Sequence, residues 1–397
     1  MMDALLGDAE TVDAARRLRQ EVDIAEAVAR AAWSVIAEPG DAVVGTLIHE
    51  LGAADALDFA LGSRTADTAA STDEGTAVAA RRALSEGRKR WRPRADPRGV
   101  RDALRNARDI DAVLLLPGDE DWPVSLDDLG ASTPSALWVR GRTELLTAEP
   151  RISLVGARAS SGYGEHVAAE IAGDLAATGA VVVSGGAYGI DGAAHRAALG
   201  VKGATVAFLA GGVDRAYPAG HQELIRRIAQ EGAVVSEAPC GGAPTKWRFL
   251  ARNRLIAALG HATVVVEAGW RSGSLNTAGH AAALGRPLGA VPGPVTSASS
   301  AGCHRLLREY DAQCVTSPAE VRELWGTAAA ASLHSDPVDP ERIRLLDAMS
   351  TRSRASVEEL ARRAGLAPDR VRALLGLLQL EGVVRRDESG WRRVSVP

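Results

Sequence analysis

The sequence predicts an α/β protein: a Rossmann-like, doubly wound parallel sheet, preceded by a helical region and followed by a winged-helix unit. Two observations predict the sheet. Between residues 151 and 291, short apolar runs alternate with segments of helical periodicity, which is the pattern of βαβ units with right-handed crossovers. The apolar runs are nearly continuous, as expected for strands that helices cover on both faces.

The elements follow in a regular order. We expect strands at 112–116, 136–140, 152–155, 180–184, 205–209, 233–236, 263–267 and 287–291, and helices at 165–178, 190–199, 221–231, 254–259 and 277–284. Before them, the spacing predicts helices at 25–36 and 43–61, the second interrupted at Gly52, and a polar loop at 66–73. We therefore expect a helical domain with a basic linker (1–110), a Rossmann-like core (111–326) and a linker (327–340).

The remaining residues, 341–397, have the pattern of a winged helix. Helices are expected at 341–350, 356–364 and 369–381, and a hairpin is expected from 382–384 and 391–396. The recognition helix offers only Arg370 and Arg372 near its start. Winged helices serve both in duplex binding and in protein contacts, and this pattern leaves both roles open.

Composition narrows the function classes. The net charge is −4, so nucleic-acid binding would need local basic patches. One candidate is the arginine-rich stretch 81–108, which could equally be a solvated helix face. The three cysteines have no C-x-x-C spacing, so neither a disulfide framework nor a zinc site is expected. The turn at Gly156 does not match G-x-G-x-x-G and the next strand ends in Ser184 and not in an acidic residue, so NAD is not expected and no cofactor is predicted. With no apolar run of about 20 residues and no signal-peptide pattern, we expect a cytoplasmic protein without a membrane partner.

The most informative feature is a series of polar, mostly glycine-rich turns placed between strands and helices. Glycine allows backbone N–H groups to approach a ligand closely, and a helix N-terminus adds partial positive charge. A row of such turns along one sheet edge would suit a chain of phosphates better than a single nucleotide. The candidate phosphate-binding residues are Gly156, Ala157, Arg158, Ser184, Gly185, Gly186, Gly211, Lys246, Arg252, Asn253, Arg254, Ser272, Gly273 and Ser274. Within this set, the Arg252–Arg254 triplet is expected at a helix start, where its guanidinium groups suit adjacent phosphates.

Each turn also has a simpler reading as a structural turn, an ion pair or a helix cap. Asp191 and His195 lie four residues apart, so they could form a catalytic pair or merely cap the helix and satisfy a buried ring. No nucleophile with a partnered base, metal-ligand cluster or Walker lysine is evident, which predicts binding and not catalysis. The alternatives are a nucleotide hydrolase or phosphoribohydrolase that uses Glu267 or Asp191, and a winged-helix transcription regulator.

The order of the motifs resembles the DNA-processing protein DprA (Smf) family over residues 111–315. The motifs include V-G-A-R at 155–158, S-G-G-A at 184–187, R-N-R at 252–254 and S-G-S-L at 272–275. This resemblance implies an extended Rossmann fold with a SAM-like N-terminal domain, head-to-head homodimers, and single-stranded DNA binding that protects strands and helps load the RecA recombinase in natural transformation. It also implies that Arg158 and the turns at 185–186, 252–254 and 272–274 hold phosphates. The sequence departs from the family at His221, Gln222, His304 and Tyr310, and these changes put DNA affinity near them in question.

Overall fold

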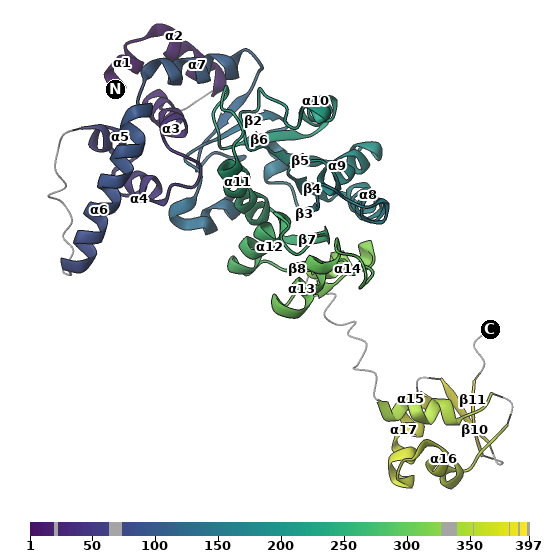
Figure 1. The fold of residues 1–397 in the computed structure, drawn as a ribbon. Helices are drawn as coiled ribbons and strands as arrows, with labels where there is room; N and C mark the ends of the chain where they lie inside the picture. Colours follow the sequence, from purple (N-terminus) through teal and green to yellow (C-terminus); the bar gives the residue numbers. More distant parts are fainter. Residues whose placement is uncertain are drawn as a thin grey trace. The chain divides into compact units, whose positions relative to one another are not determined.

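The computed structural model describes residues 1–19, 23–62, 74–326, 340–351, 353–380, 382–387 and 390–394. The chain divides into two compact units, Met1–Trp325 and Gly326–Pro397 (Figure 1). The loop expected at 66–73 lies outside the described residues, and so does the expected linker except for its last residue, Pro340. In the described part of the chain, no helix has the length and apolarity needed to cross a membrane.

The first hundred residues are helical, as the spacing predicts. Aspartates define several of these helices, because the side chains of Asp8, Asp23, Asp41 and Asp96 each accept a hydrogen bond from an N–H of the first turn. Gly52, with φ of 78°, separates two helices where the apolar spacing is interrupted. The elements are α1 (Met2–Leu6), α2 (Ala9–Leu18), α3 (Ile24–Ile36), α4 (Ala42–Leu51), α5 (Ala53–Leu61), α6 (Glu74–Trp91), η1 (Arg92–Arg94) and α7 (Pro97–Arg108).

A mixed sheet forms the centre of the first unit, and among the described residues it has nine strands in the order β1-β2-β6-β5-β4-β3-β7-β8-β9. Strands β3 to β9 are all parallel, which confirms the predicted doubly wound sheet, and β1 and β2 form an antiparallel hairpin beside β6. The strands are β1 (Val113–Leu115), β2 (Leu137–Gly141), β3 (Arg151–Gly156), β4 (Val181–Ser184), β5 (Thr205–Phe208), β6 (Ala233–Ser236), β7 (Ala262–Glu267), β8 (Leu288–Ala290) and β9 (Gln313–Cys314).

Helices cover both faces of this sheet. They are α8 (Gly162–Ala177), α9 (Ile190–Gly200), α10 (Gln222–Glu231), α11 (Lys246–Leu259), α12 (Ser274–Ala283), α13 (Ala301–Glu309) and α14 (Pro318–Leu324), with short turns η2 (Val124–Ser132), η3 (Thr143–Leu146) and η4 (Ala219–His221). Alternate residues of each strand enter different hydrophobic clusters. Leu154 packs with α8, α9 and α14, whereas Val155 packs with α11, α12 and α13. The apolar runs therefore reflect burial on two sides.

One helix boundary predicted from the sequence is wrong in a way that matters for the site. The helix expected at 254–259 begins eight residues earlier, at Lys246, because the Thr245 side chain caps it by accepting from Arg248 N–H. The Arg252–Arg254 triplet therefore lies in the second half of α11 and not at a helix start.

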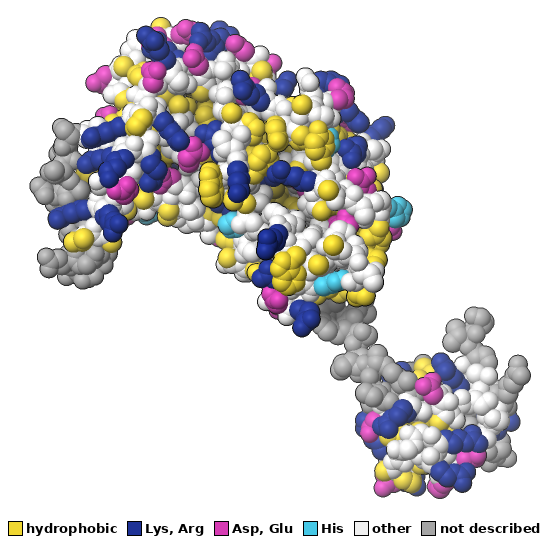
Figure 2. Space-filling model, in the orientation of Figure 1, with side chains coloured by type: hydrophobic (Ala, Val, Ile, Leu, Met, Phe, Trp, Pro, Cys, Tyr) yellow, Lys and Arg dark blue, Asp and Glu magenta, His cyan; other side chains and the backbone are white. Residues whose placement is uncertain are grey.

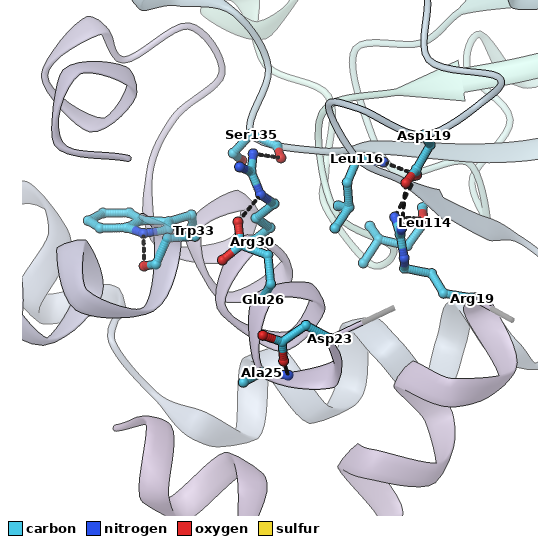
Figure 3. A network of polar contacts seen from close by, with 11 residues as sticks. Arg19, Asp23, Ala25, Glu26, Arg30, Trp33, Leu114, Leu116, Asp119 and Ser135 are labelled. Atoms are coloured by element: carbon cyan, nitrogen blue, oxygen red, sulfur yellow. Dashed lines mark hydrogen bonds and ion pairs between the residues drawn. The ribbon is translucent and has the colours of Figure 1, made fainter. Parts of the chain in front are cut away.

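The N-terminal helices share a hydrophobic cluster with the hairpin edge of the sheet. The rings of Trp33 and Trp91 meet edge to face at 5.5 Å, and both belong to the cluster that contains Trp138 of β2. Polar contacts fix the same junction (Figure 3). Arg19 forms a two-pronged ion pair with Asp119 at 2.5 and 2.6 Å, and Arg30 donates to the Ser135 carbonyl at 2.9 Å. The helical region thus forms one compact unit with the sheet.

The second unit confirms the predicted winged helix. It contains α15 (Pro340–Ala348), α16 (Val357–Ala364), α17 (Pro368–Leu380) and an antiparallel hairpin of β10 (Val384–Asp387) and β11 (Gly390–Arg393). Leu345, Leu360, Val371 and Trp391 are among the residues of its core. Gly365 ends α16 in the left-handed conformation, which glycine adopts without strain.

Candidate nucleic-acid interface

A cleft of about 520 Å³ opens at the carboxyl ends of the parallel strands. It lies where β3 has β4 on one side and β7 on the other, which is the switch point at which open α/β sheets bind ligands. The loops after β3, β4 and β7 line it together with one face of α11. The predicted residues that it brings together are Gly156, Ala157, Arg158, Arg252, Asn253, Ser272, Gly273 and Ser274. The predicted residues outside its lining are Ser184, Gly185, Gly186, Gly211, Lys246 and Arg254.

Two exposed arginines supply positive charge to the cleft. Arg158 follows β3, and Arg271 follows β7. Among the described residues, no carboxylate forms an ion pair with either side chain. The guanidinium carbon of Arg158 lies 4.5 Å from the centre of the Phe249 ring, so a cation and an aromatic face lie together. These two groups can therefore approach an anionic ligand without first breaking a salt bridge.

Arg271 and Phe249 line the cleft but were not among the binding residues predicted from the sequence. Arg271 directly precedes the serine turn, and a cation beside a predicted anion-binding turn was the signal that could have found it. Phe249 lies three residues after Lys246, one turn along α11 from the predicted cation, but the helix was expected to start later. The Phe249 ring also contacts Tyr217, with ring centres 5.5 Å apart.

The serine turn lies at the start of α12, as the sequence predicts. The hydroxyls of Ser272 and Ser274 are 2.7 Å apart, and α12 begins at Ser274. Asn253 reaches this turn from α11, where its amide donates to the Gly273 carbonyl at 3.4 Å and to the Asn276 side chain at 3.3 Å. Hydroxyls at a helix N-terminus, where the helix carries partial positive charge, suit an anion.

The Gly185–Gly186 turn differs from its expected role, because its backbone donors are used inside the protein. Asp191 accepts hydrogen bonds from the N–H groups of Gly185 and Ala187, at 3.1 and 3.4 Å. The N–H of Gly186 donates to His195, and the Ser184 hydroxyl donates to the Leu154 carbonyl at 2.6 Å. This turn is therefore held together by its own carboxylate and imidazole, and these N–H groups do not face a ligand.

Arg252 forms the floor of the cleft. One of its Nη atoms donates to the carbonyls of Gly185 and Phe208, at 2.6 and 2.8 Å, while its buried Nε has no partner among the described residues. The pKa of Arg252 is lowered to about 10, mainly by burial, with Asp191 acting to raise it and the neighbouring Arg158 acting to lower it. The side chain stays a cation at neutral pH, held in place by two carbonyls.

The remaining predicted contacts lie elsewhere. Arg254 is buried in an ion pair of 2.8 Å with Glu237, so its guanidinium is already neutralised inside the fold. Lys246 lies over the exposed ring of Trp247 at 5.8 Å, at the start of α11. A Cβ at Gly211 would lie 2.8 Å from the Gly242 carbonyl oxygen, so this glycine serves the close packing of two loops.

Asp191 and His195 do not form the conceivable catalytic pair. The Nδ1–H of His195 donates to the Thr205 hydroxyl at 2.7 Å, and that hydroxyl donates to the Val182 carbonyl. With Nε2 accepting from Gly186, the ring is the neutral tautomer, and burial lowers its pKa to about 3. Burial raises the pKa of the Asp191 carboxyl, which lies under the turn.

The other acid considered for catalysis, Glu267, is also structural. It is buried at the end of β7, where it accepts from the Ser161 N–H at 2.8 Å.

Two of the residues at which the sequence departs from the family pattern form hydrogen bonds within the protein. His221 donates to the Gly186 carbonyl, and His304 donates to the Gly293 carbonyl, both at 3.0 Å. Within the described residues, no cluster of His, Cys, Asp or Glu could hold a metal ion.

Comparisons with known proteins agree with this architecture. Residues 113–326 match the family model for DNA recombination-mediator protein A, and residues 328–390 match the DprA winged helix domain. The chain is 46% identical over 297 residues to a putative DNA processing protein DprA of Mycobacterium tuberculosis, covering 70% of this chain and 76% of the relative. It is 39% identical over 207 residues to DNA processing protein DprA of Streptococcus pneumoniae, covering 51% and 71% of the two chains.

A solved structure extends the similarity to the fold. The X-ray structure of DprA from S. pneumoniae superposes with a TM-score of 0.60 at 28% identity, covering 76% of this chain and 98% of that chain. A doubly wound sheet followed by a winged helix, matched by these family models, places the chain in a class of DNA-processing proteins. The chain belongs to the DNA-processing protein DprA (Smf) family, as its motif order predicts.

Proposed function

We propose that the cleft binds the phosphate backbone of single-stranded DNA. The observation that carries this proposal is the pair of exposed arginines, Arg158 and Arg271, which line the same cleft as the serine-lined start of α12 and have no carboxylate partner among the described residues. Arginine forks and a helix N-terminus are the groups that proteins use for phosphate. Membership of a DNA-processing family supports DNA as the source of those phosphates.

Phe249 favours a single strand over a duplex. Its ring lies in the cleft beside Arg158, where an unpaired base could stack on it. In a duplex, base faces are covered by neighbouring bases and only their edges are accessible. Because the arginines read phosphate and the ring accepts any base, binding should depend strongly on salt and weakly on sequence.

We propose a binding function and not an enzymatic one. The acids and the base that a nucleotide hydrolase would need are Asp191, Glu267 and His195. Each of these side chains already accepts a hydrogen bond from a backbone N–H group of the protein. Release of free base or sugar phosphate from nucleoside monophosphates by the purified protein would contradict this part of the proposal.

From the family membership we also propose that the bound protein is a homodimer that helps load the RecA recombinase during natural transformation. The description of the matched family as a recombination mediator supports this step. Sedimentation of the purified chain tests the dimer. RecA-dependent strand exchange on DNA covered by single-strand-binding protein, with and without this protein, tests loading.

The deciding experiment is a titration of fluorescent oligo-dT, alone and as a duplex with oligo-dA, at two salt concentrations. We expect tight binding of the single strand that weakens as salt rises, and much weaker binding of the duplex. Absence of binding to oligo-dT at low salt, or equal affinity for both forms, would contradict the proposed function.

A further inference from the structure

The exposed aromatic residues of the first unit follow a pattern that the cleft alone does not explain. The chain has only four tyrosines and eight tryptophans, all within the described residues, and five of these twelve rings are exposed in the loops or first helical turns that follow parallel strands. Each of five adjacent strands contributes one. They are Trp247 after β6 (73% exposed), Tyr217 after β5 (47%), Tyr188 after β4 (47%), Tyr163 after β3 (46%) and Trp270 after β7 (57%).

The strand order places these rings along one edge of the sheet. The strands lie side by side as β6-β5-β4-β3-β7 and run parallel, so all five loops leave from the same edge. With about 4.8 Å between neighbouring strands, the row spans about 19 Å. In Figure 2, yellow side chains gather with dark-blue ones over the region where Figure 1 places β4 to β6 and α11.

Direct contacts join neighbouring members of the row. The Gly220 N–H donates to the Tyr188 hydroxyl at 3.1 Å, which ties the loop after β4 to the loop that carries Tyr217. The Tyr217 ring contacts the Phe249 ring, which also lies beside the guanidinium groups of Arg158 and Arg252. At the far end, the Arg305 guanidinium lies 5.3 Å from the centre of the Trp270 ring. Tyr188 and Tyr217 are thus tied together near Arg158, and Trp270 lies beside Arg305, which also pairs with Glu309 at 2.7 Å.

We propose that these five rings form a row of base-stacking platforms, and that a single strand crosses the sheet edge from β6 to β7. This inference rests on the proposed function. It adds the path of the DNA across the sheet edge and the way in which the bases are held. Exposed aromatic rings near Arg158 and Arg271, which have no ion partner among the described residues, suit bases joined by phosphates, because every base has a stacking face and every nucleotide carries one charge.

The test compares oligo-dT with an abasic deoxyribose-phosphate oligomer of the same length. We expect the wild-type protein to bind oligo-dT at least about tenfold more tightly, because only oligo-dT can stack. The double substitution Tyr217→Leu with Trp247→Leu should weaken oligo-dT binding by about tenfold or more, yet leave abasic binding and the salt slope unchanged. Trp270→Leu, at the other end of the row, should act in the same direction.

Two matched variants separate stacking from charge and from general surface effects. Arg158→Ala should weaken binding of both oligomers. Val201→Ala removes part of an exposed apolar side chain that follows α9 and precedes β5, at the amino ends of the parallel strands, and should change neither. All substituted side chains are exposed, so we expect every variant to fold. Unchanged thermal melting, measured by circular dichroism, checks this.

The outcomes distinguish this inference from the function on which it rests. Wild-type protein that binds both oligomers equally well would leave single-strand binding in place and overturn the stacking row. An equal loss on both oligomers for the Tyr217 and Trp247 variant, or no loss at all, would also overturn it, and no loss would leave a protein partner as the occupant of these rings. Failure of the wild type to bind either oligomer would overturn both proposals.

Discussion

The guanidinium of Arg158 lies 4.5 Å from the Phe249 ring, so the loop after β3 and helix α11 present a cation and an aromatic face as one surface. The two residues are 91 positions apart in the chain, and the sheet brings them together. This contact places the exposed charge of the cleft beside a ring on which a base can stack.

Replacement of Arg158 by alanine should weaken single-stranded DNA binding for all sequences alike. The loss of one phosphate contact should flatten the slope of log affinity against log salt by about 0.7. Titrations of oligo-dT at several salt concentrations measure both. Arg142→Ala is the control, because Arg142 pairs with Glu144 beyond the end of β2, at the opposite edge of the sheet. An unchanged slope for Arg158→Ala would remove this residue from the phosphate path.

Gly185→Ala should destabilise the protein, although the residue does not line the cleft. A Cβ there would lie 1.9 Å from Nη1 of Arg252, so the guanidinium would have to leave its two carbonyl partners. We expect a loss of about 1–3 kcal/mol in the free energy of unfolding, measured by urea denaturation. Gly279→Ala, in α12 with open space around it, should instead be neutral or stabilising by up to about 1 kcal/mol. Equal stabilities of the two variants would contradict this packing argument.

Arg254→Leu should lower stability and leave the DNA salt slope unchanged. Removing the guanidinium leaves the Glu237 carboxylate buried without its ion partner, which costs about 3–5 kcal/mol. Adding Glu237→Gln should recover part of that loss, because the amide oxygen still accepts from the Gly40 N–H without a buried charge. Denaturation and oligo-dT titration of both variants test this. A flattened salt slope in folded Arg254→Leu would place Arg254 on the phosphate path.

Acid should destabilise the protein partly through His195. The pKa of this buried ring falls from 6.5 to about 3 on folding, so its stabilising contribution is complete above pH 6.5 and is lost as pH falls toward 3. Uptake of one proton on unfolding corresponds to at most about 1.4 kcal/mol per pH unit. His195→Asn should show a flatter dependence of unfolding free energy on pH between 6.5 and 4, and substitution of the exposed His166 is the control. The same slope in all three proteins would contradict the buried-imidazole account.

Local sequence patterns predicted most strands and helices of the core up to residue 291, because burial on two faces makes a strand's sequence almost continuously apolar. Continuous apolar runs such as that of β4, and the glycine turns that follow them, predicted the parallel sheet, and the motif order predicted the family. The start of α11 was missed because its capping residue, Thr245, precedes a stretch without amphipathic periodicity. The R-N-R triplet was consequently assigned to a helix start when it lies within the helix.

The sequence alone determined which turns exist and where they fall along the chain. Only the tertiary structure decided which of their polar groups can meet a ligand. Gly186 and Ser272 belong to equally plausible anion-binding turns, but His195 already accepts from the first, while the second opens into the cleft. Whether a donor is free depends on what packs against it from distant parts of the chain. That information lies in the arrangement of the elements and not in the turn itself.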